Sequence, residues 1–390
     1  MSNRVQNIPR GEREELLAIA RKFKDVISLG RGDPDLNTPK VIVDAAIQAL
    51  REGCTHYTHW AGLLELRQAI AQKLLRDNNL RYDPETEIVV TAGAQEAINV
   101  VFQTLINPGD EILIPDPYYT PYETAAKLAG GIVRHVPLDE KQAFVLQPED
   151  LEEHIGHKTK ILIINSPHNP TGTVMPAEIL AGIADIAIKH DLLVISDEIY
   201  EKLVYDDYKH ISIASFPGMR ERTVVINGFS KAYSMTGWRV GYFAAPSDFV
   251  AKASMIKYTF TISAPHAAQF AALAALSPEG QATIPETVAI YDERRRYMIK
   301  ALAEMGLSYR YPAGTFYIFV DVRPTGRNSF SFCRDLLLDA HVLVLPGTAY
   351  GNAEGYVRLS LVVPLEQLKV AAQRMGEVVQ KYIAEARGEG

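Results

Sequence analysis

Lys231 stands in a segment whose residue types could hold a covalently bound cofactor. It lies in the run Gly228-Phe-Ser-Lys-Ala-Tyr-Ser-Met-Thr-Gly-Trp-Arg239, eight residues before the guanidinium of Arg239. A lysine amine reacts with an aldehyde only when it is unprotonated, so a site of this kind must lower the pKa of the lysine. Because most lysines beside serine and glycine are solvated loop residues, other segments have to support this interpretation.

Asp197 could serve such a cofactor from the end of a strand. It follows the apolar run Leu192-Leu-Val-Ile-Ser196, which predicts a buried strand, and open α/β sheets bind ligands at the carboxyl ends of their strands. An aspartate there can keep a proton on a pyridine nitrogen, although a helix N-cap explains the same residue. Tyr200 follows three residues later and would face the same ligand if the segment forms a helical turn.

A phosphate site is predicted where a strand passes through a glycine turn into a helix. The run from Glu87 to Ala97 has this order, with the turn at Gly93. The free amides of Ala94 and Gln95 would lie at the helix start, where the positive end of the helix dipole favours a phosphate dianion. One glycine turn is weak evidence by itself.

Asn169 and Arg358 are candidates for contacts to oxygen atoms of a ligand. Asn169 follows the strand-like run 160–165 and could bond a ring oxygen, although its Asn-Pro and Thr-Gly neighbours are equally typical of a plain turn. Arg358 alternates with apolar residues in Tyr356-Val-Arg-Leu-Ser360, and a planar guanidinium binds a carboxylate bidentately. An exposed arginine on a strand is the alternative for Arg358.

Taken in order along the chain, these segments resemble the fold-type I pyridoxal phosphate (PLP) aminotransferases of class I/II, especially the branch of prokaryotic aspartate and aromatic amino acid aminotransferases. The resemblance runs from Ser28-Leu-Gly-Arg-Gly-Asp-Pro-Asp35 to Gly355-Tyr-Val-Arg-Leu-Ser360. It implies an α/β fold with a mostly parallel central sheet flanked by helices and a smaller α+β second domain. We expect residues 46–288 to form the large PLP-binding domain, and residues 1–45 with 289–390 to form the small one.

The resemblance implies a role for each of the motif residues. Lys231 would form the Schiff base and carry the proton, Asp197 would pair with the ring nitrogen, Tyr200 and Asn169 would bond O3′, and Tyr119 would stack on the ring. The phosphate would be bound by Gly93, Ala94, Gln95, Ser230, Arg239 and, from a second subunit, Tyr57. Arg358 would bind the substrate α-carboxylate, helped by Asn169 and the backbone of Gly32. No metal site is expected.

Two positions depart from the aspartate-specific pattern, and both concern the substrate side chain. Gln95 stands where aspartate-specific relatives carry a lysine that binds the distal carboxylate. Arg31 stands where relatives commonly carry an aliphatic residue, and we expect it to attract the distal carboxylate of glutamate, 2-oxoglutarate or aspartate. A solvated loop arginine is the alternative for Arg31.

The resemblance implies an aminotransferase (EC 2.6.1) that moves the amino group of an L-α-amino acid to a 2-oxo acid by a ping-pong mechanism. Aspartate, aromatic or a broad range of donors are expected, with 2-oxoglutarate as the acceptor. A PLP-dependent C–S β-lyase or another fold-type I enzyme is the alternative, because the cofactor contacts are shared among these activities. A homodimer is implied by the role of Tyr57, although Tyr57 is also explained as a packing residue among neighbouring aromatics.

Composition excludes several other classes of protein. The 390 residues carry a net charge of −7 without a long basic run, so we expect no nucleic acid partner. No apolar run approaches ~18 residues, so we expect no membrane segment. Cys54 and Cys333 are too few for a disulfide framework or a zinc site, which favours a cytoplasmic protein.

Overall fold

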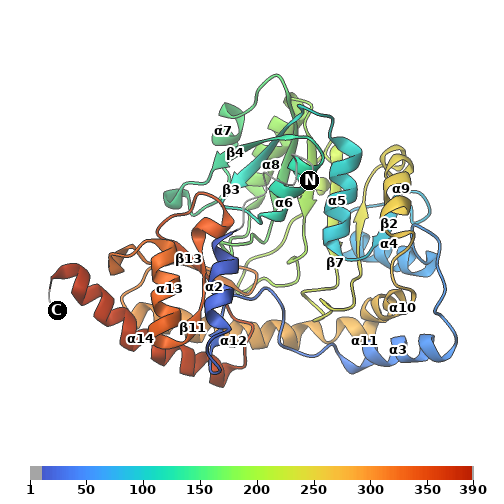
Figure 1. Cartoon of the computed structure of the whole chain (residues 1–390). Coiled ribbons are helices and arrows are strands. Elements are labelled where there is room, and N and C mark those ends of the chain that lie inside the picture. The colour runs from blue at the N-terminus through green and yellow to red at the C-terminus, as the bar shows by residue number, and fades with distance from the viewer. Residues whose placement is uncertain (1–10, 389–390) are drawn as a thin grey trace.

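The computed structural model describes residues 11–388, and a seven-stranded sheet lies at its centre (Figure 1). The strands follow the order β2-β8-β7-β6-β5-β3-β4; β4, β3, β5, β6 and β7 run parallel, whereas β8 is antiparallel to both β7 and β2. The predicted mostly parallel α/β sheet is therefore confirmed. The strands are β2 (Ile88–Thr91), β3 (Glu111–Asp116), β4 (Ile132–Pro137), β5 (Thr159–Asn165), β6 (Leu193–Asp197), β7 (Thr223–Gly228) and β8 (Gly241–Ala244).

Helices cover both faces of this sheet, which explains why its inner strands are continuous apolar runs. In β5, Ile161 and Ile163 pack on one face against α5, α6 and α9, while Leu162 and Ile164 pack on the other face against α7 and α8. The helices α3, α4 and α10 cover the second face near β2, β7 and β8. These helices are α3 (Lys40–Arg51), α4 (Leu64–Asn78), α5 (Ala94–Leu105), α6 (Pro121–Leu128), α7 (Pro148–Glu153), α8 (Ala177–Lys189), α9 (Ser247–Thr261) and α10 (His266–Ala275).

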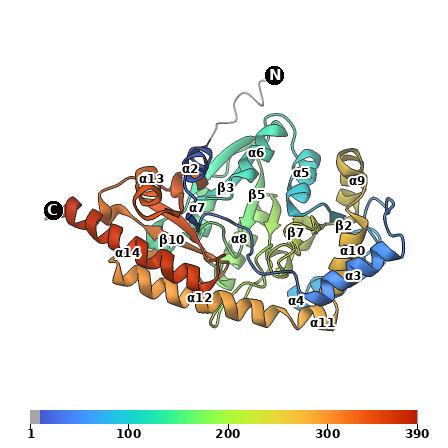
Figure 2. The same ribbon diagram turned by 60° about the horizontal axis from the view of Figure 1, so that its bottom comes forward.

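A second, smaller sheet is antiparallel, with the strand order β12-β13-β10-β9, and the long helices α12 and α14 pack beside it (Figure 2). The N-terminal segment joins this part of the molecule, because β1 pairs with β11 and α2 packs against α13 and β12. The elements of this part are α2 (Glu12–Ala20), β1 (Ile27–Ser28), α12 (Ile284–Glu304), β9 (Tyr309–Arg310), β10 (Tyr317–Asp321), α13 (Ser329–Ala340), β11 (Val342–Leu343), β12 (Leu345–Pro346), β13 (Tyr356–Ser360) and α14 (Leu365–Arg387). The short helix α11 (Pro278–Gln281) instead packs against α3 and α10.

The predicted domain limits at residues 45 and 288 fall inside α3 and α12. The division into 46–288 and the two flanking segments therefore stays a prediction. Between residues 11 and 388, no helix is both long and apolar enough to cross a membrane.

The parallel strands bring their carboxyl ends to one edge of the large sheet. Asn165 ends β5 and lies beside Asp197, which ends β6, and the side-chain amide of Asn165 donates to the carbonyl oxygen of Asp197 over 2.9 Å. Gly228 ends the next strand and leads directly into the segment that carries Lys231. The fold thus gathers three motifs that are distant in the sequence at the position where α/β sheets bind ligands.

Candidate active site

A cavity of about 940 Å³ opens at this edge of the sheet, and its wall includes residues of both sheets and of α2. Most of the site residues predicted from the sequence line it together. They are Gly32, Ala94, Gln95, Tyr119, Asn169, Asp197, Tyr200, Ser230, Lys231, Arg239 and Arg358. The volume suits a small-molecule ligand.

The amine of Lys231 lies inside this cavity under an aromatic cover. Its Nζ donates to the carbonyl oxygen of Gly32 over 2.6 Å and lies 5.8 Å and 5.7 Å from the ring centroids of Tyr200 and Phe316. Burial lowers the pKa of the Lys231 amine, and the nearby guanidinium of Arg358 lowers it further. The site therefore favours the unprotonated amine that a nucleophilic lysine requires.

Asp197 is a buried carboxyl group that is held on both oxygens. Its Oδ2 accepts a hydrogen bond from the phenol of Tyr122 over 2.6 Å, and its Oδ1 accepts one from the backbone amide of Ile199 over 3.2 Å. Burial raises the pKa of Asp197 to about 6, although these two hydrogen bonds act in the opposite direction. A cationic partner would stabilise the ionised form of this carboxyl group, because a positive charge would offset the desolvation of the carboxylate.

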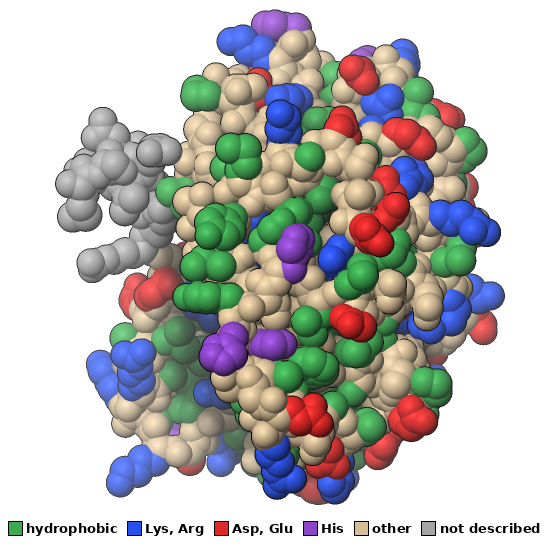
Figure 3. Space-filling view, turned by 90° about the vertical axis from the view of Figure 1, so that its right-hand side faces the viewer, with side chains coloured by type: hydrophobic (Ala, Val, Ile, Leu, Met, Phe, Trp, Pro, Cys, Tyr) green, Lys and Arg blue, Asp and Glu red, His purple; other side chains and the backbone are tan. Residues whose placement is uncertain are grey.

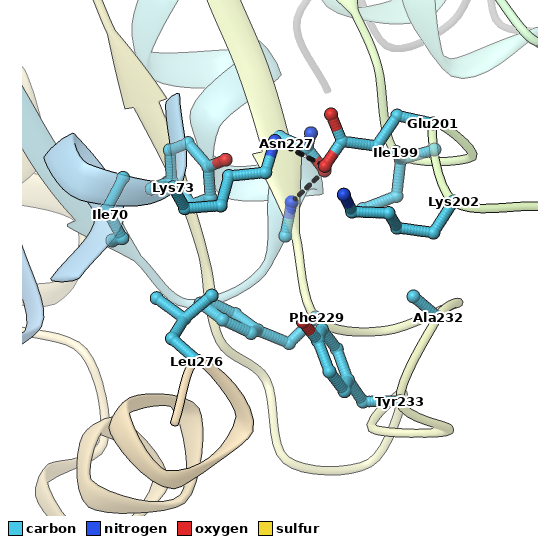
Figure 4. A pocket seen from close by; sticks show the side chains of 12 residues that line it. Ile70, Lys73, Ile199, Glu201, Lys202, Asn227, Phe229, Ala232, Tyr233 and Leu276 are labelled. Atoms are coloured by element: carbon cyan, nitrogen blue, oxygen red, sulfur yellow. Dashed lines mark hydrogen bonds and ion pairs between the residues drawn. The ribbon is translucent and has the colours of Figure 1, made fainter. Parts of the chain in front are cut away.

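The segment that carries Asp197 and Tyr200 is anchored from behind by two other acidic residues. Glu198 and Glu201 do not line the large cavity, and Glu201 forms an ion pair with the buried amine of Lys73. This pair borders a second, much smaller cavity of about 10 Å³, in which Figure 4 shows the two side chains meeting. The two glutamates therefore fix the backbone that presents Asp197 and Tyr200 to the larger cavity.

One group of potential metal ligands lies in the same anchoring region. The ligand atoms of Glu198, Glu201 and His210 all lie within 4.8 Å of one another. Lys73 already pairs with Glu201, and the hydroxyl of Ser212 donates to Glu198 over 2.5 Å, so protein groups bind these carboxylates. This network is explained by its anchoring role.

Tyrosines make up much of the remaining wall. The hydroxyl oxygens of Tyr200 and Tyr317 are 3.0 Å apart, and their rings lie at 70° to each other. Tyr119 donates from its hydroxyl to Oε1 of Gln95 over 3.2 Å and meets the ring of Tyr122 edge-on. Aromatic rings on several sides can enclose a planar ligand.

An anion cradle is formed at the start of α5. Gly93 has φ +85°, which favours glycine, and a Cβ at this position would lie 2.9 Å from Cζ of Arg239. A Cβ at Gly241 of β8 would lie 2.7 Å from the amide nitrogen of Ala94, so both glycines permit close packing around the turn. The first amides of a helix have no acceptor within the helix, and they face the same cavity as Ser230 and Arg239.

Arg358 forms the opposite, cationic part of the cavity. Its guanidinium lies 4.0 Å and 4.4 Å from the ring centroids of Tyr317 and Tyr350, and its Nη2 donates to the carbonyl oxygen of Gly30 over 3.0 Å. Its Nε is buried without a hydrogen-bond partner in the part of the chain that the structure describes. An oriented guanidinium with an unused donor is suited to a carboxylate ligand.

Three predicted residues do not line the cavity. Gly93 supports the turn from behind, through its contact with Arg239. Tyr57 is 76% exposed, so a role in binding would need a second chain. Arg31 is exposed at the surface, and its role stays a prediction.

Other cavity residues were not found from the sequence. Tyr122 could have been found, because it follows Tyr119 by three residues at a helix start and such residues share one side of a helix. Arg13 lines the cavity from α2, and its side chain makes no ion pair or hydrogen bond with another residue of the range 11–388. No local pattern marks Arg13, because its position depends on the packing of α2 against α13 and β12.

Comparisons with known proteins agree with this geometry. A model of the family "Aminotransferase class I and II" matches residues 24–375. An aspartate aminotransferase of Pyrococcus abyssi is 46% identical over 385 residues, 98% of both chains, and an aromatic-amino-acid aminotransferase of Thermococcus litoralis is 41% identical, also over 98% of both. The solved aspartate aminotransferase from Thermus thermophilus with maleate is 36% identical and superposes with a TM-score of 0.92, covering 97% of this chain and 99% of that one.

Proposed function

This chain belongs to the class I and II aminotransferases, and on that premise we propose that it binds PLP and transfers the amino group of aspartate and of aromatic amino acids to 2-oxoglutarate. The observation that carries the proposal is the position of Lys231, an amine of lowered pKa in one cavity with the buried carboxyl of Asp197 and the guanidinium of Arg358. Transamination needs these three groups: an amine that reacts with an aldehyde, a carboxylate that pairs with a cationic ring, and a cation that binds the α-carboxylate of the substrate.

The residues that line the cavity fit PLP by their chemistry. The amides of Ala94 and Gln95, with Ser230 and Arg239, suit its phosphate, because a helix start and a guanidinium both favour a dianion. A cationic ring nitrogen would offset the desolvation that raises the pKa of Asp197 to about 6. When bound, PLP supplies a ring that accepts negative charge from the substrate α-carbon.

The protein's part in the reaction is to position the substrate and to move one proton. Arg358, oriented by Asn169, would bind the α-carboxylate and turn the Cα–H bond toward the amine of Lys231. Burial lowers the pKa of Lys231, which increases the share of unprotonated amine that can accept that proton. Tyr200 and Asn169 would donate to the ring oxygen, and Asp197 would hold a proton at the ring nitrogen.

Arg13 is our candidate for binding a carboxylate on the substrate side chain. Burial raises the pKa of Tyr119 to about 12, and the positive charge of Arg13 is one of the groups that oppose this rise. Arg13 affects Tyr350 in the same sense, although burial there again dominates and raises the pKa. The positive charge of Arg13 is thus near the tyrosines of the cavity wall. Arg31, which the sequence suggested for this role, is the competing candidate.

A homodimer that shares its active sites is the second part of the proposal. Figure 3 shows hydrophobic side chains gathered on the side of the molecule where α3 and α9 lie. The exposed large hydrophobic residues of this region are Ile47, Leu50, Tyr57, Met255, Tyr258 and Phe260. An apolar surface of this kind is typical of an interface, and Tyr57 within it would extend into the partner's phosphate site.

A single-turnover experiment tests the reaction. PLP-loaded protein is mixed with aspartate, phenylalanine or cystathionine, and the absorbance of the bound cofactor is followed. We expect aspartate and phenylalanine to convert the cofactor to its amine form, and 2-oxoglutarate to reverse the change, with no conversion in Lys231→Ala. Pyruvate release from cystathionine without that conversion would instead indicate a C–S β-lyase.

A further inference from the structure

Glu96 holds the phosphate-binding turn from outside the cavity. It is the third residue of α5, and its Oε2 accepts a hydrogen bond from the backbone amide of Ala92 over 2.5 Å. Ala92 directly precedes Gly93, and its carbonyl oxygen accepts a hydrogen bond from Arg239 over 3.3 Å. Because Glu96 itself does not line the cavity, it can affect a ligand only through the shape of this turn.

The other carboxylate oxygen of Glu96 is held by α9. The hydroxyl of Thr261 donates to Oε1, and the amine of Lys257 lies 3.4 Å from the same atom. Lys257 has a side chain with 0% exposure, and its amine also donates to Thr261 over 2.7 Å. Burial lowers the pKa of Lys257 and the charge of Glu96 opposes this, so the ammonium depends on Glu96 for its stability.

The helix that supplies Lys257 and Thr261 also carries part of the exposed apolar surface. Met255 and Tyr258 lie three positions apart on the outer side of α9. Lys257 and Thr261 lie four positions apart on the side that faces Glu96, where Lys257 is buried and Thr261 is exposed. One rigid helix therefore lies between the apolar surface and the carboxylate that fixes the phosphate-binding turn.

We propose that Glu96 is a positioning residue for the phosphate-binding turn, and that Lys257 and Thr261 hold it from α9 so that phosphate binding and subunit association are coupled. The inference rests on the proposed function, because it takes the phosphate of PLP as the ligand of the turn and a second copy of the chain as the partner of α9. A partner that orders α9 strengthens the hold on Glu96, and by reciprocity phosphate binding strengthens the association.

Binding of PLP and of pyridoxal, which lacks the phosphate, separates this role from a general loss of structure. Lys257→Met removes the ammonium and keeps the apolar part of the side chain. We expect this variant to bind PLP about tenfold more weakly and to bind pyridoxal with unchanged affinity. Thr261→Val is a milder second variant if Lys257→Met folds poorly. Lys252→Met is the matched control, because Lys252 is exposed on the same helix.

A double variant tests whether the two residues act as one pair. Glu96→Gln alone should lower the affinity for PLP and leave that for pyridoxal unchanged. The double variant Glu96→Gln with Lys257→Met should bind PLP no more weakly than the weaker-binding single variant, because each substitution removes the same contact. Dissociation of the dimer, followed by sedimentation with and without PLP, should show that PLP tightens the wild-type dimer more than the Lys257→Met dimer.

The outcomes keep the inference separate from the proposed function. If the wild type binds PLP no better than pyridoxal, or stays monomeric, the proposed function fails and the inference fails with it. If the wild type prefers PLP and forms a dimer but Lys257→Met and Glu96→Gln keep that preference, only the inference is overturned. If these variants bind PLP and pyridoxal more weakly to the same extent, Glu96 and Lys257 have a merely structural role and the inference is likewise overturned.

Discussion

Arg358 donates from Nη1 to Oδ1 of Asn169 over 2.9 Å, although 189 residues separate them in the chain. The contact joins β13 of the smaller sheet to the loop after β5 of the larger one. The backbone amide of Asn169 in turn donates to Oδ1 of Asn165 over 2.9 Å, and Asn165 binds the carbonyl of Asp197. The guanidinium and the buried carboxyl are therefore placed by one continuous chain of hydrogen bonds.

Replacing Arg358 by lysine should therefore mainly impair substrate binding. A lysine keeps the charge but loses the bidentate geometry and the contact with Asn169, so we expect KM for the amino acid to rise about 100-fold. Steady-state kinetics measure this, with Arg323→Lys as a control outside the cavity. An unchanged KM would contradict the assignment of the α-carboxylate to Arg358.

The two arginines near the substrate side chain can be distinguished by parallel variants. Arg13→Ala should raise KM for aspartate and 2-oxoglutarate about tenfold and leave KM for phenylalanine unchanged, because only the first two carry a distal carboxylate. Arg31→Ala should change none of these values. The reverse result, with the effect confined to Arg31→Ala, would restore the assignment made from the sequence.

Asp197 should make the cofactor-free protein less stable as the pH rises. Burial raises its pKa from 3.8, the value of an unperturbed aspartate, to about 6, so the folded chain binds this proton more tightly than the unfolded chain does. The stability this gives is present below about pH 4 and is lost as the pH rises through about 6. The free energy of unfolding of Asp197→Asn should therefore rise by up to about 3 kcal/mol relative to that of the wild type between pH 4.5 and 7.

Urea unfolding of the cofactor-free wild type and of Asp197→Asn at a series of pH values measures that difference. Asp185→Asn provides a control for charge removal. A difference between wild type and Asp197→Asn that does not change with pH would show that burial does not raise the pKa of Asp197.

A mixed dimer tests whether Tyr57 acts in the partner's site. A chain with Lys231→Ala and a chain with Tyr57→Phe each form impaired homodimers, but their hybrid contains one site with an intact Lys231 and an intact Tyr57 from the other chain. We expect the hybrid to recover about half of the wild-type activity per dimer. No recovery beyond the Tyr57→Phe homodimer would mean that Tyr57 does not act across an interface.

Much of the fold could be predicted from local sequence. The apolar run before Asp197 and the strand–turn–helix order around Gly93 became β6 and the junction of β2 with α5. These features depend on periodicity and turn chemistry, which act within a few residues. Local patterns also marked Lys231, Asp197 and Arg358 as candidates, but each pattern allowed a solvated lysine, a helix N-cap or an exposed arginine. The roles of these residues were implied by the resemblance of the whole chain to the aminotransferases.

What the tertiary structure decided is which side chains meet. Tyr122 reaches Asp197, Arg13 enters the wall of the cavity while Arg31 does not, and Lys257 is buried against Glu96. Each of these contacts joins elements that are far apart in the sequence, and a shift of one helix by a few ångströms would remove it. Residue types and short spacings determine the chemistry that is available, whereas long-range packing determines the distances over which it acts.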